Sequence, residues 1–356
     1  MRYRKLAICA LLIAAVAVVM MLSSCGNAGL DGSAGTGEGT TAEEDPEAIE
    51  VYAMDTYMTL SAYGENAGKA LSESEAEIKR IDAMLSTGSE DSEISKLNKS
   101  KKAEVSEETF SLIKRAKTIG LDTGKVFDIS VYPVMQAWGF TDKNYRVPEK
   151  SELKELLKSV DVSKVDLDEQ NHEVSFDDEM AIDLGGIAKG YTSQRVIEIM
   201  KENGIEHALI NLGGNVQVLG KKPDGSDWRV AIADPEDQEQ YVGGVAVSDK
   251  AVITSGGYQR YFDKDGERYF HIIDLSDGFP ARNGLTSVTI VSDDGTLADA
   301  LSTSLFIMGP DKAAEYWKKN AEDFDAVLVE DDGTVLVTEG LKDSYFSDRE
   351  FEIIEK

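Results

Sequence analysis

The sequence predicts an α+β fold made of mixed, largely antiparallel sheets with helices packed against them. Helical and strand-like patterns are interleaved without the regular alternation that a doubly wound parallel sheet requires. Several strand-like runs follow one another after only a few turn residues, as expected for antiparallel neighbours. No repeat of solenoid length is present, and the length of 356 residues suits one large domain or two modest ones.

Helices are predicted where apolar residues recur at helical spacing. The first, over residues 67–85, places Leu71, Ile78 and Ile81 on one face. The others are expected at 107–119, at 150–160 with Ser151 as N-cap, in a segment that opens at Gly185 and Gly186, at 297–308 and at 311–320. Strands are indicated at 165–176, 208–212, 215–219, 228–233, 244–247, 287–291, 326–328 and 334–337.

The composition excludes several classes of protein. There are 37 Lys and Arg against 66 Asp and Glu, for a net charge of −29, which argues against binding to DNA or RNA because nucleic-acid affinity depends on basic surfaces. Only two cysteines occur, so neither a disulfide scaffold nor a thiolate zinc site is expected. Apolar residues make up 42% of the chain, which is enough for a substantial core.

The first 24 residues are predicted to be a lipoprotein signal peptide. A basic start precedes an apolar run over 6–22, and the segment ends in Leu22, Ser23, Ser24 and Cys25, which resembles the bacterial lipobox. We therefore expect export, lipidation of Cys25 and anchoring at the extracytoplasmic face of the cell membrane; an ordinary signal peptide or signal anchor is the alternative. Residues 25–50 are predicted to be a flexible acidic tether, 51–345 a folded domain and 346–356 a C-terminal tail.

The run Asp183 to Tyr191 (DLGGIAKGY) favours a phosphate site. Two glycines open a helix, and Lys189 falls in its first turns. Free amides at a helix start, together with a lysine, suit an anion. A capped helix with Lys189 in solvent explains the same spacing equally well.

Asp299 and Thr303 lie four residues apart on a predicted helix, with Ser302 beside them. A carboxylate and hydroxyls are hard oxygen ligands of the kind that Mg²⁺ accepts. An acidic first turn with a polar residue beneath it is the structural alternative. His271 precedes Asp274 by three residues and could act as a base or bind a ligand, although a histidine satisfied within the core is the commoner outcome.

Taken in order, these motifs resemble one family, the ApbE flavin transferases. The matching segments are Met54 to Thr56, 92–98 (SEISKLN), 127–128 with Trp138 and Gly139, 183–191, 211–215 (NLGGN), 254–258 (TSGGY), 271–274 and 299–303. Any one of these segments is unspecific. Eight in one order, over nearly the whole folded part, make coincidence untenable.

The resemblance implies an ApbE-like (T-fold-like) architecture and Mg²⁺-dependent transfer of FMN from FAD to a Thr or Ser hydroxyl of a target protein, with AMP as the other product. A pyrophosphatase that cleaves FAD to FMN and AMP, and a lipid-anchored protein that only binds FAD, are the alternatives. The implied partner, besides FAD and the membrane, is a membrane-bound or extracytoplasmic redox subunit.

The family's functional residues can be carried over to matching positions in this chain. The implied metal ligands are Gly186 through its carbonyl, Asp299 and Thr303, with Ser302 beside them. The implied catalytic residues are His271, Asp299 and Lys189. The implied FAD-binding residues are Met54, Val126, Phe127, Asp128, Asp183, Lys189, His271 and Ile273. The chain departs from the family pattern at Asp55, Gly88 and Leu275, without loss of a metal ligand.

Overall fold

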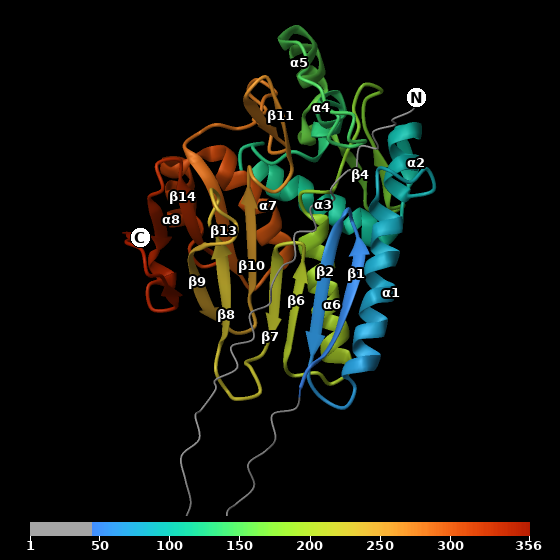
Figure 1. The fold of residues 1–356 in the computed structure, drawn as a ribbon. Helices are drawn as coiled ribbons and strands as arrows, with labels where there is room; N and C mark the ends of the chain where they lie inside the picture. Colours follow the sequence, from blue (N-terminus) through green and yellow to red (C-terminus); the bar gives the residue numbers. More distant parts are fainter. Residues whose placement is uncertain (1–44) are drawn as a thin grey trace, which may run out of the picture. The chain divides into compact units, whose positions relative to one another are not determined.

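The computed structural model describes residues 45–356 and contains a nine-stranded sheet at its centre (Figure 1). Neighbouring strands are antiparallel except for the last pair, β15 and β17, which is parallel. In spatial order the strands are β1 (Glu47–Ala53), β2 (Thr56–Ala62), β6 (Ala208–Leu212), β7 (Asn215–Leu219), β10 (Ala251–Gly256), β13 (Leu285–Ser292), β14 (Asp325–Glu330), β15 (Val335–Thr338) and β17 (Glu352–Ile354). The predicted α+β class with largely antiparallel sheets is confirmed.

One face of this sheet is covered by helices. These are α1 (Ala67–Leu85), α6 (Ala188–Glu202), α7 (Gly295–Met308) and α8 (Pro310–Asn320). Because side chains alternate along a strand, Ala251 and Ile253 of β10 point into the core cluster that includes α7, whereas Val252 points to the opposite face. The helix α6 packs between α1 and α7, which places its first turn over the middle of the sheet.

Among the described residues, other elements cover only part of the opposite face. A three-stranded sheet of β16 (Tyr345–Phe346), β9 (Tyr241–Val247) and β8 (Trp228–Ala233) shares a core cluster with Val218, Val252 and Val327 of the large sheet. On β1 and β2 the outward residues Tyr52 and Tyr57 are 56% and 77% exposed, and their rings meet edge to face. The uncovered part of the sheet therefore carries an exposed aromatic pair.

The remaining elements surround one end of the sheet, at the top of Figure 1. Aromatic rings that include Trp138, Phe140 and Phe262 form a separate small core there. The elements are α2 (Glu93–Ser100), α3 (Glu107–Asp122), α4 (Tyr132–Trp138), α5 (Lys150–Leu156), the sheet of β3 (Lys102–Glu104), β5 (Glu173–Ser175) and β4 (Asp166–Asp168), and the hairpin of β11 (Tyr261–Lys264) and β12 (Glu267–Phe270).

The structure corrects several predicted boundaries. The run 165–176 is a hairpin of β4 and β5, because His172 adopts a positive φ of 51° in the turn between them. Ser151 is not the N-cap of α5; Glu149 holds that position without a side-chain bond, and the helix ends at Leu156 with a 3₁₀ turn after it. The helix expected from Gly185 begins at Ala188, with the glycines in the turn before it.

The domain also begins and ends outside its predicted limits. Strand β1 starts at Glu47, inside the segment predicted as tether, and β17 pairs with β15 inside the predicted tail. Both added strands lie at edges of the large sheet. Strands β1, β2 and β10 and helix α2 are among the elements that the sequence patterns did not predict.

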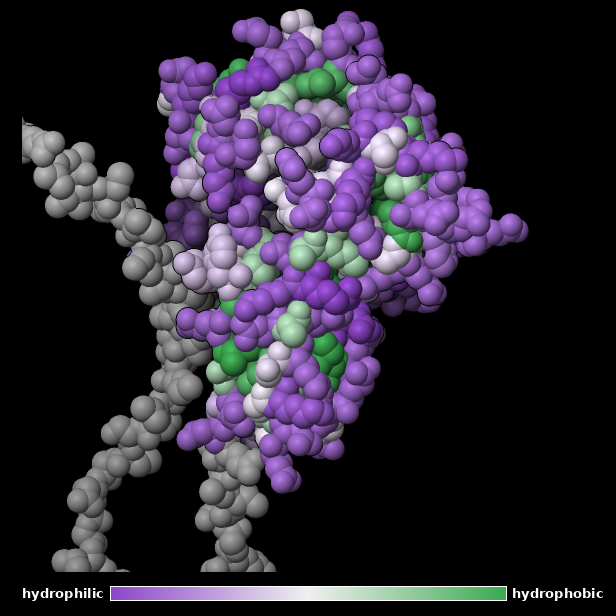
Figure 2. Space-filling view, turned by 90° about the vertical axis from the view of Figure 1, so that its right-hand side faces the viewer, coloured by the Kyte–Doolittle hydropathy of each residue, from purple (hydrophilic) through white to green (hydrophobic). Residues whose placement is uncertain are grey.

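Within residues 45–356 no helix is both long enough and apolar enough to cross a membrane. Figure 2 shows the side of the molecule that carries α1, and hydrophilic residues cover most of it. Cys25, the predicted signal peptide and most of the predicted tether lie outside the described residues.

Candidate active site

Two tight turns meet at one end of the large sheet. Met54 and Asp55 join β1 to β2 with φ values of 49° and 58°, and Gly213 and Gly214 join β6 to β7 with φ values of 64° and 98°. A Cβ on Gly213 would lie 2.1 Å from Oγ1 of Thr56, so the close contact of the two turns requires glycine there. Strand β10 finishes at the same end, because β10 and β7 are paired antiparallel near the start of β7.

Asp299 is the centre of a buried polar cluster beside these turns. It projects from α7, is 4% exposed, and accepts a hydrogen bond on Oδ2 from the amide of Gly190 at 2.8 Å. Its Oδ1 accepts a second bond from Nδ2 of Asn215 at 3.0 Å and lies 3.7 Å from Nζ of Lys189. The cluster thus joins α6, α7 and β7 through one carboxylate.

The two helices approach closely because glycines face each other at their crossing. A Cβ on Gly190 would lie 2.1 Å from the carbonyl oxygen of Gly295 and 2.6 Å from Cβ of Asp299. A Cβ on Gly295 would in turn lie 3.0 Å from the carbonyl oxygen of Gly190. This crossing brings the first turn of α6, with Lys189, against the Asp299 side chain.

Three hydroxyl groups meet one turn further along α7, two from α7 itself and one from β10. Oγ of Ser255, at the end of β10, is 2.7 Å from Oγ of Ser302 and 3.3 Å from Oγ1 of Thr303. Ser302 also donates to the carbonyl of Asp299 at 2.8 Å. Ser302 is fully buried, whereas Thr303 is partly exposed, so Thr303 is the hydroxyl of α7 that a ligand can reach.

The donor set of this cluster fits Mg²⁺. Asp299 and Thr303 supply a carboxylate and an accessible hydroxyl, which are hard oxygen donors. The carbonyl of Gly186 accepts no hydrogen bond from residues 45–356, and the Gly190 amide, one turn later, bonds to Asp299 instead. No group of three His, Cys, Asp or Glu side chains within this range could hold a metal, so the candidate ligands are one carboxylate with hydroxyl and carbonyl oxygens.

Asp183 shapes the turn in front of α6. Its Oδ1 accepts a hydrogen bond from the amide of Gly185 at 2.6 Å, and its Oδ2 accepts one from Oγ1 of Thr87 at 3.2 Å. Burial of the carboxylate raises the pKa of Asp183, while these two hydrogen bonds and the charge of Arg260 oppose the shift. Burial of the Asp183 charge costs stability, and the two hydrogen bonds and the charge of Arg260 offset that cost in part.

His271 lies in the same region and is held as a neutral imidazole. Its Nδ1 is 3.3 Å from the carbonyl oxygen of Arg260, which assigns the proton to Nδ1 and leaves Nε2 as an acceptor. Burial lowers the pKa of His271 to about 4, and the positive charges of Arg260 and Lys189 act in the same direction. Asp274 does not orient the imidazole, because its carboxylate accepts bonds from Ser276 and Asn283.

The other predicted FAD-binding residues have different surroundings. Met54 lies in the β1–β2 turn with Sδ 3.8 Å from Oγ1 of Thr192, so it packs against α6 near Lys189. Val126 and Phe127 belong to the loop after α3, and Phe127 lies beside Gly186, where a Cβ would be 3.0 Å from its ring. Ile273 is buried in the small aromatic core.

Asp128 does not present a free carboxylate to a ligand. Its Oδ1 accepts bonds from the amide and hydroxyl of Ser130, and its Oδ2 accepts one from the amide of Val162 at 2.8 Å. The side chain therefore caps a 3₁₀ turn and fixes a neighbouring loop.

Four residues of this region were missed as site residues in the sequence analysis: Thr87, Asn215, Arg260 and Ser255. Asn215 and Ser255 lie inside the NLGGN and TSGGY segments, so these two motifs could have identified them as site residues. Thr87 and Arg260 lie far in sequence from the residues they bond, and no local pattern marks them.

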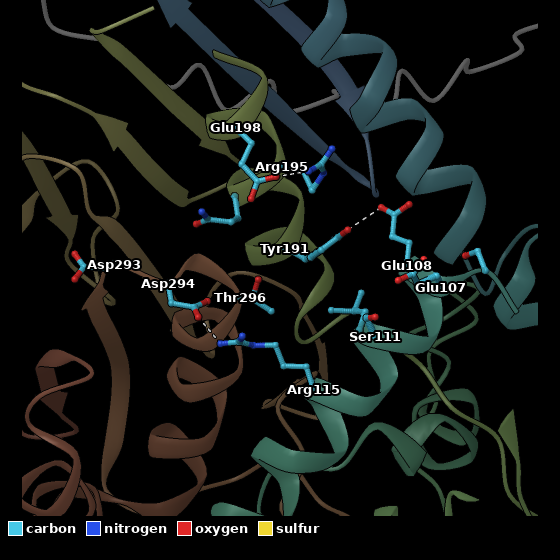
Figure 3. Close-up of a pocket in the computed structure, with 13 residues that line it drawn as sticks. Glu107, Glu108, Ser111, Arg115, Tyr191, Arg195, Glu198, Asp293, Asp294 and Thr296 are labelled. Atoms are coloured by element: carbon cyan, nitrogen blue, oxygen red, sulfur yellow. Dashed lines mark hydrogen bonds and ion pairs between the residues drawn. The ribbon is translucent and has the colours of Figure 1, made fainter. Parts of the chain in front are cut away.

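A separate groove of about 810 Å³ lies between α3, α6 and the start of α7 (Figure 3). None of Lys189, Asp299 and His271 lines it. Figure 3 shows several of its polar and charged groups already bonded, with Tyr191 donating to Glu108, Arg115 paired with Asp294 and Arg195 paired with Glu198. This groove is therefore distinct from the buried cluster around Asp299.

Comparison with known proteins places this geometry in a family. The sequence model of the ApbE family matches residues 54–328 of this chain. A FAD:protein FMN transferase of Klebsiella pneumoniae (strain 342) is 32% identical over 266 residues, covering 73% of this chain and 82% of the relative. A FAD:protein FMN transferase of Treponema pallidum (strain Nichols) is 31% identical over 284 residues, covering 75% of this chain and 78% of the relative.

A solved structure agrees with the family assignment. The crystal structure of the ApbE protein of Thermotoga maritima is 34% identical to this chain and superposes with a TM-score of 0.79, covering 84% of this chain and 98% of the other. The resemblance found in the sequence motifs is thereby confirmed. The chain belongs to the ApbE family.

Proposed function

We propose that this protein is a transferase that moves FMN from FAD to a Thr or Ser hydroxyl of a target protein. The acceptor oxygen forms a bond to the phosphorus of the FMN moiety, the bond from that phosphorus to the bridging oxygen breaks, and AMP leaves. The hydroxyl proton passes to a base in the site. The observation that carries this proposal is the buried Asp299 beside Lys189 and the start of α6, in a family whose relatives are named FAD:protein FMN transferases.

Mg²⁺ is the metal that this donor set suits. Asp299, Thr303 and the Gly186 carbonyl would hold it, with Ser302 and Ser255 supporting the Thr303 hydroxyl. When bound, Mg²⁺ would neutralise charge on the diphosphate. Without such an ion, a buried carboxylate at this position would repel the diphosphate of FAD.

Lys189 and the first turn of α6 are placed to bind that diphosphate. Lys189 is partly exposed, with 29% of its side chain accessible, so its ammonium can reach both Asn215 and a ligand. In the first turn of α6 the amide of Ala188 bonds to the Leu184 carbonyl and that of Gly190 bonds to Asp299, so within residues 45–356 the amide of Lys189 is the one left for a ligand. Holding the diphosphate beside the acceptor contributes by positioning, which is worth about 7 to 11 kcal/mol in favourable cases.

His271 is the candidate for the proton acceptor. Its Nε2 is free to accept while Nδ1 is directed at the Arg260 carbonyl. The lowered pKa keeps the imidazole neutral at physiological pH, as a base must be before it accepts a proton.

The decisive experiment is an assay of flavin transfer. The protein is incubated with FAD, Mg²⁺ and an acceptor that a related flavin transferase modifies, and fluorescence of the denatured acceptor is measured with AMP release. We expect the wild-type protein to produce covalently bound flavin and AMP in equal amounts. We expect the Asp299→Ala variant to produce neither. FMN and AMP without acceptor labelling would instead identify a pyrophosphatase, and tight FAD binding without Mg²⁺ dependence or products would identify a flavin-binding protein.

We further infer that the protein works at a membrane surface outside the cytoplasm. The motif ending in Cys25 supports lipidation, and two acyl chains hold a protein stably where one does not. The target would then be a membrane-bound or extracytoplasmic redox subunit. Growth of cells with an alkyne fatty acid should label the wild-type protein. The substitution Cys25→Ser should abolish the label and release the protein from membranes. Equal labelling of the two proteins would refute the lipid anchor.

A further inference from the structure

Asn215 bridges the two charged residues of the site. It is the first residue of β7 and is 1% exposed. Its Nδ2 donates to Oδ1 of Asp299 at 3.0 Å, and its Oδ1 accepts from Nζ of Lys189 at 3.2 Å. The orientation of the amide is fixed, because a lysine ammonium can only donate and a carboxylate can only accept.

We propose that Asn215 is a positioning residue that keeps Lys189 and Asp299 apart, so that both remain available to the diphosphate of FAD and its metal. Nζ of Lys189 and Oδ1 of Asp299 are 3.7 Å apart, well beyond the ~2.7 to 2.9 Å of a direct charge-assisted hydrogen bond. Both the ammonium and the amide of Asn215 approach the same carboxylate oxygen. This inference rests on the proposed function.

The separation matters because the two charges attract strongly in a buried site. Asp299 is almost fully buried, so water screens the attraction poorly. If the amide were absent, Lys189 could close onto Asp299 and form a direct ion pair. That pair would occupy the carboxylate that is expected to bind the metal and the ammonium that is expected to bind the diphosphate.

The side chain at this position needs a donor and an acceptor at once. Aspartate would lose the donor and place a second carboxylate beside Asp299. Leucine has a similar size and offers neither group. The backbone holds Asn215 in place, because its strand pairs with Leu212 on one side and Ile253 on the other.

Gln217 provides a matched control. It lies two residues along the same strand, faces the same helices and is 3% exposed. Its amide bonds to Ser193 and Gln194 of α6, with no contact to Lys189 or Asp299. Gln217→Leu therefore removes a buried amide of the same strand without touching the charged pair.

The test measures Mn²⁺ affinity in place of activity. The dissociation constant is taken from loss of the free-Mn²⁺ resonance signal as each variant is added without nucleotide, because ADP in solution would itself bind Mn²⁺. Residues that hydrogen-bond metal ligands typically contribute roughly 10- to 100-fold to metal affinity. We expect Asn215→Leu to weaken Mn²⁺ binding at least about tenfold, and Gln217→Leu to leave it unchanged while lowering the unfolding temperature.

A second variant, Lys189→Met, shows whether Asn215 acts by keeping Lys189 away from Asp299 or only by stabilising the fold. In the Lys189→Met background no ammonium can close onto Asp299, so Asn215→Leu should then cost much less Mn²⁺ affinity, less than about threefold. An equal loss in both backgrounds, or an equal loss with Gln217→Leu, would overturn the inference and leave the proposed function intact. Failure of the wild-type protein to bind Mn²⁺ would overturn the inference, whereas the proposed function is tested separately by the flavin-transfer assay.

Discussion

The main-chain amide of Gly190 donates a hydrogen bond to Oδ2 of Asp299 at 2.8 Å, and this bond joins the first turn of α6 to α7. Because this amide donates to a side chain, it makes no bond within the helix, and the Gly186 carbonyl accepts no hydrogen bond from the described part of the chain. One contact therefore fixes the Asp299 carboxylate and also leaves a backbone oxygen of the preceding turn without its usual helical donor. The contact depends on the two helices approaching closely at Gly190 and Gly295.

Gly190→Ala should impair both stability and transfer. The added Cβ would meet the Gly295 carbonyl at 2.1 Å, and neither backbone can yield without separating the helices. We expect about 1 to 3 kcal/mol of lost stability, typical of overpacking, with reduced Mg²⁺-dependent transfer. Gly68→Ala is the control, because its Cβ would meet only the end of the Glu47 side chain and alanine favours a helix. Equal behaviour of the two variants in urea unfolding would contradict the close crossing.

Asp299→Asn should abolish Mg²⁺-dependent transfer without unfolding the protein. The amide has the shape of the carboxylate and can still accept from Gly190, but it lacks the charge that a metal requires. A metal supplies several kcal/mol of charge stabilisation, so transfer should fall at least about a hundredfold. The measurement is the initial rate of AMP release against Mg²⁺ concentration. A normal rate with EDTA present would show that the reaction needs no metal.

Ser255→Ala should weaken the response to Mg²⁺ more than it lowers the maximal rate. Its hydroxyl is 3.3 Å from that of Thr303, so its loss should leave Thr303 free to rotate away from the proposed metal position. We expect a several-fold higher Mg²⁺ concentration at half-maximal rate. Ser304→Ala is the control, because Ser304 is buried in the same helix but bonds only to the carbonyl of Ala300. The interpretation fails if both variants shift the Mg²⁺ response equally.

The parts of the fold that sequence could predict are those with local periodicity. The 67–85 helix and the strands at 208–212, 215–219 and 228–233 have the predicted limits, because each has a clear apolar period between turn residues. Strand β1 escaped prediction because it contains Glu47 and Glu50 and continues directly from an acidic segment, so its first half looked like the tether. Strand β17 is short and is defined only by its partner, β15.

The residues of the candidate site that the sequence singled out are those that share one motif. Asp299 and Thr303 share a helix, and Lys189 follows the paired glycines, so spacing alone drew attention to them. The pairing of His271 with Asp274 was suggested by the same argument and is absent, since Asp274 is used within its own loop. The contact of Lys189 with Asn215 joins a helix to a strand 26 residues away, which no local pattern specifies.

Activity should be lost on acidification only at a pH far below the usual pKa of histidine. His271 must be neutral to accept a proton, and burial lowers its pKa to about 4 in the free protein. Since kcat/KM reports ionisations of the free enzyme, its acid midpoint should lie near pH 4. Stability should also fall between pH 6.5 and 4, where the unfolded chain binds a proton that the folded chain does not.

The measurement is kcat/KM for transfer at constant ionic strength from pH 4 to 8. An acid midpoint near 6.5 would show that His271 is solvated or is not the base. His271→Asn should lower kcat by roughly a hundredfold to ten-thousandfold, the usual contribution of a general base, and should remove this loss of activity on acidification.

Asp183→Asn should stabilise the protein at neutral pH while impairing its activity. Burial raises the pKa of Asp183 above its ordinary value, so the folded state holds the charged form at a cost. The folded chain binds more protons than the unfolded chain between the two pKa values, so this cost grows as pH rises through that window and is fully present above it. An asparagine can still accept from the Gly185 amide and carries no charge.

Urea unfolding at pH 7 and at pH 4 measures this effect. The advantage of Asp183→Asn should be larger at pH 7, because at the lower pH the wild-type carboxylate is closer to being neutral. Asp161→Asn is the control of opposite sign, since the hydrogen bond from Lys125 lowers the pKa of Asp161 to about 2 and its charge stabilises the fold. If Asp183→Asn lowered stability at pH 7, the carboxylate would be stabilised by its contacts with Thr87, Gly185 and Arg260. In the expected case, the charge of Asp183 is kept at the expense of stability, as it would be if it served FAD binding.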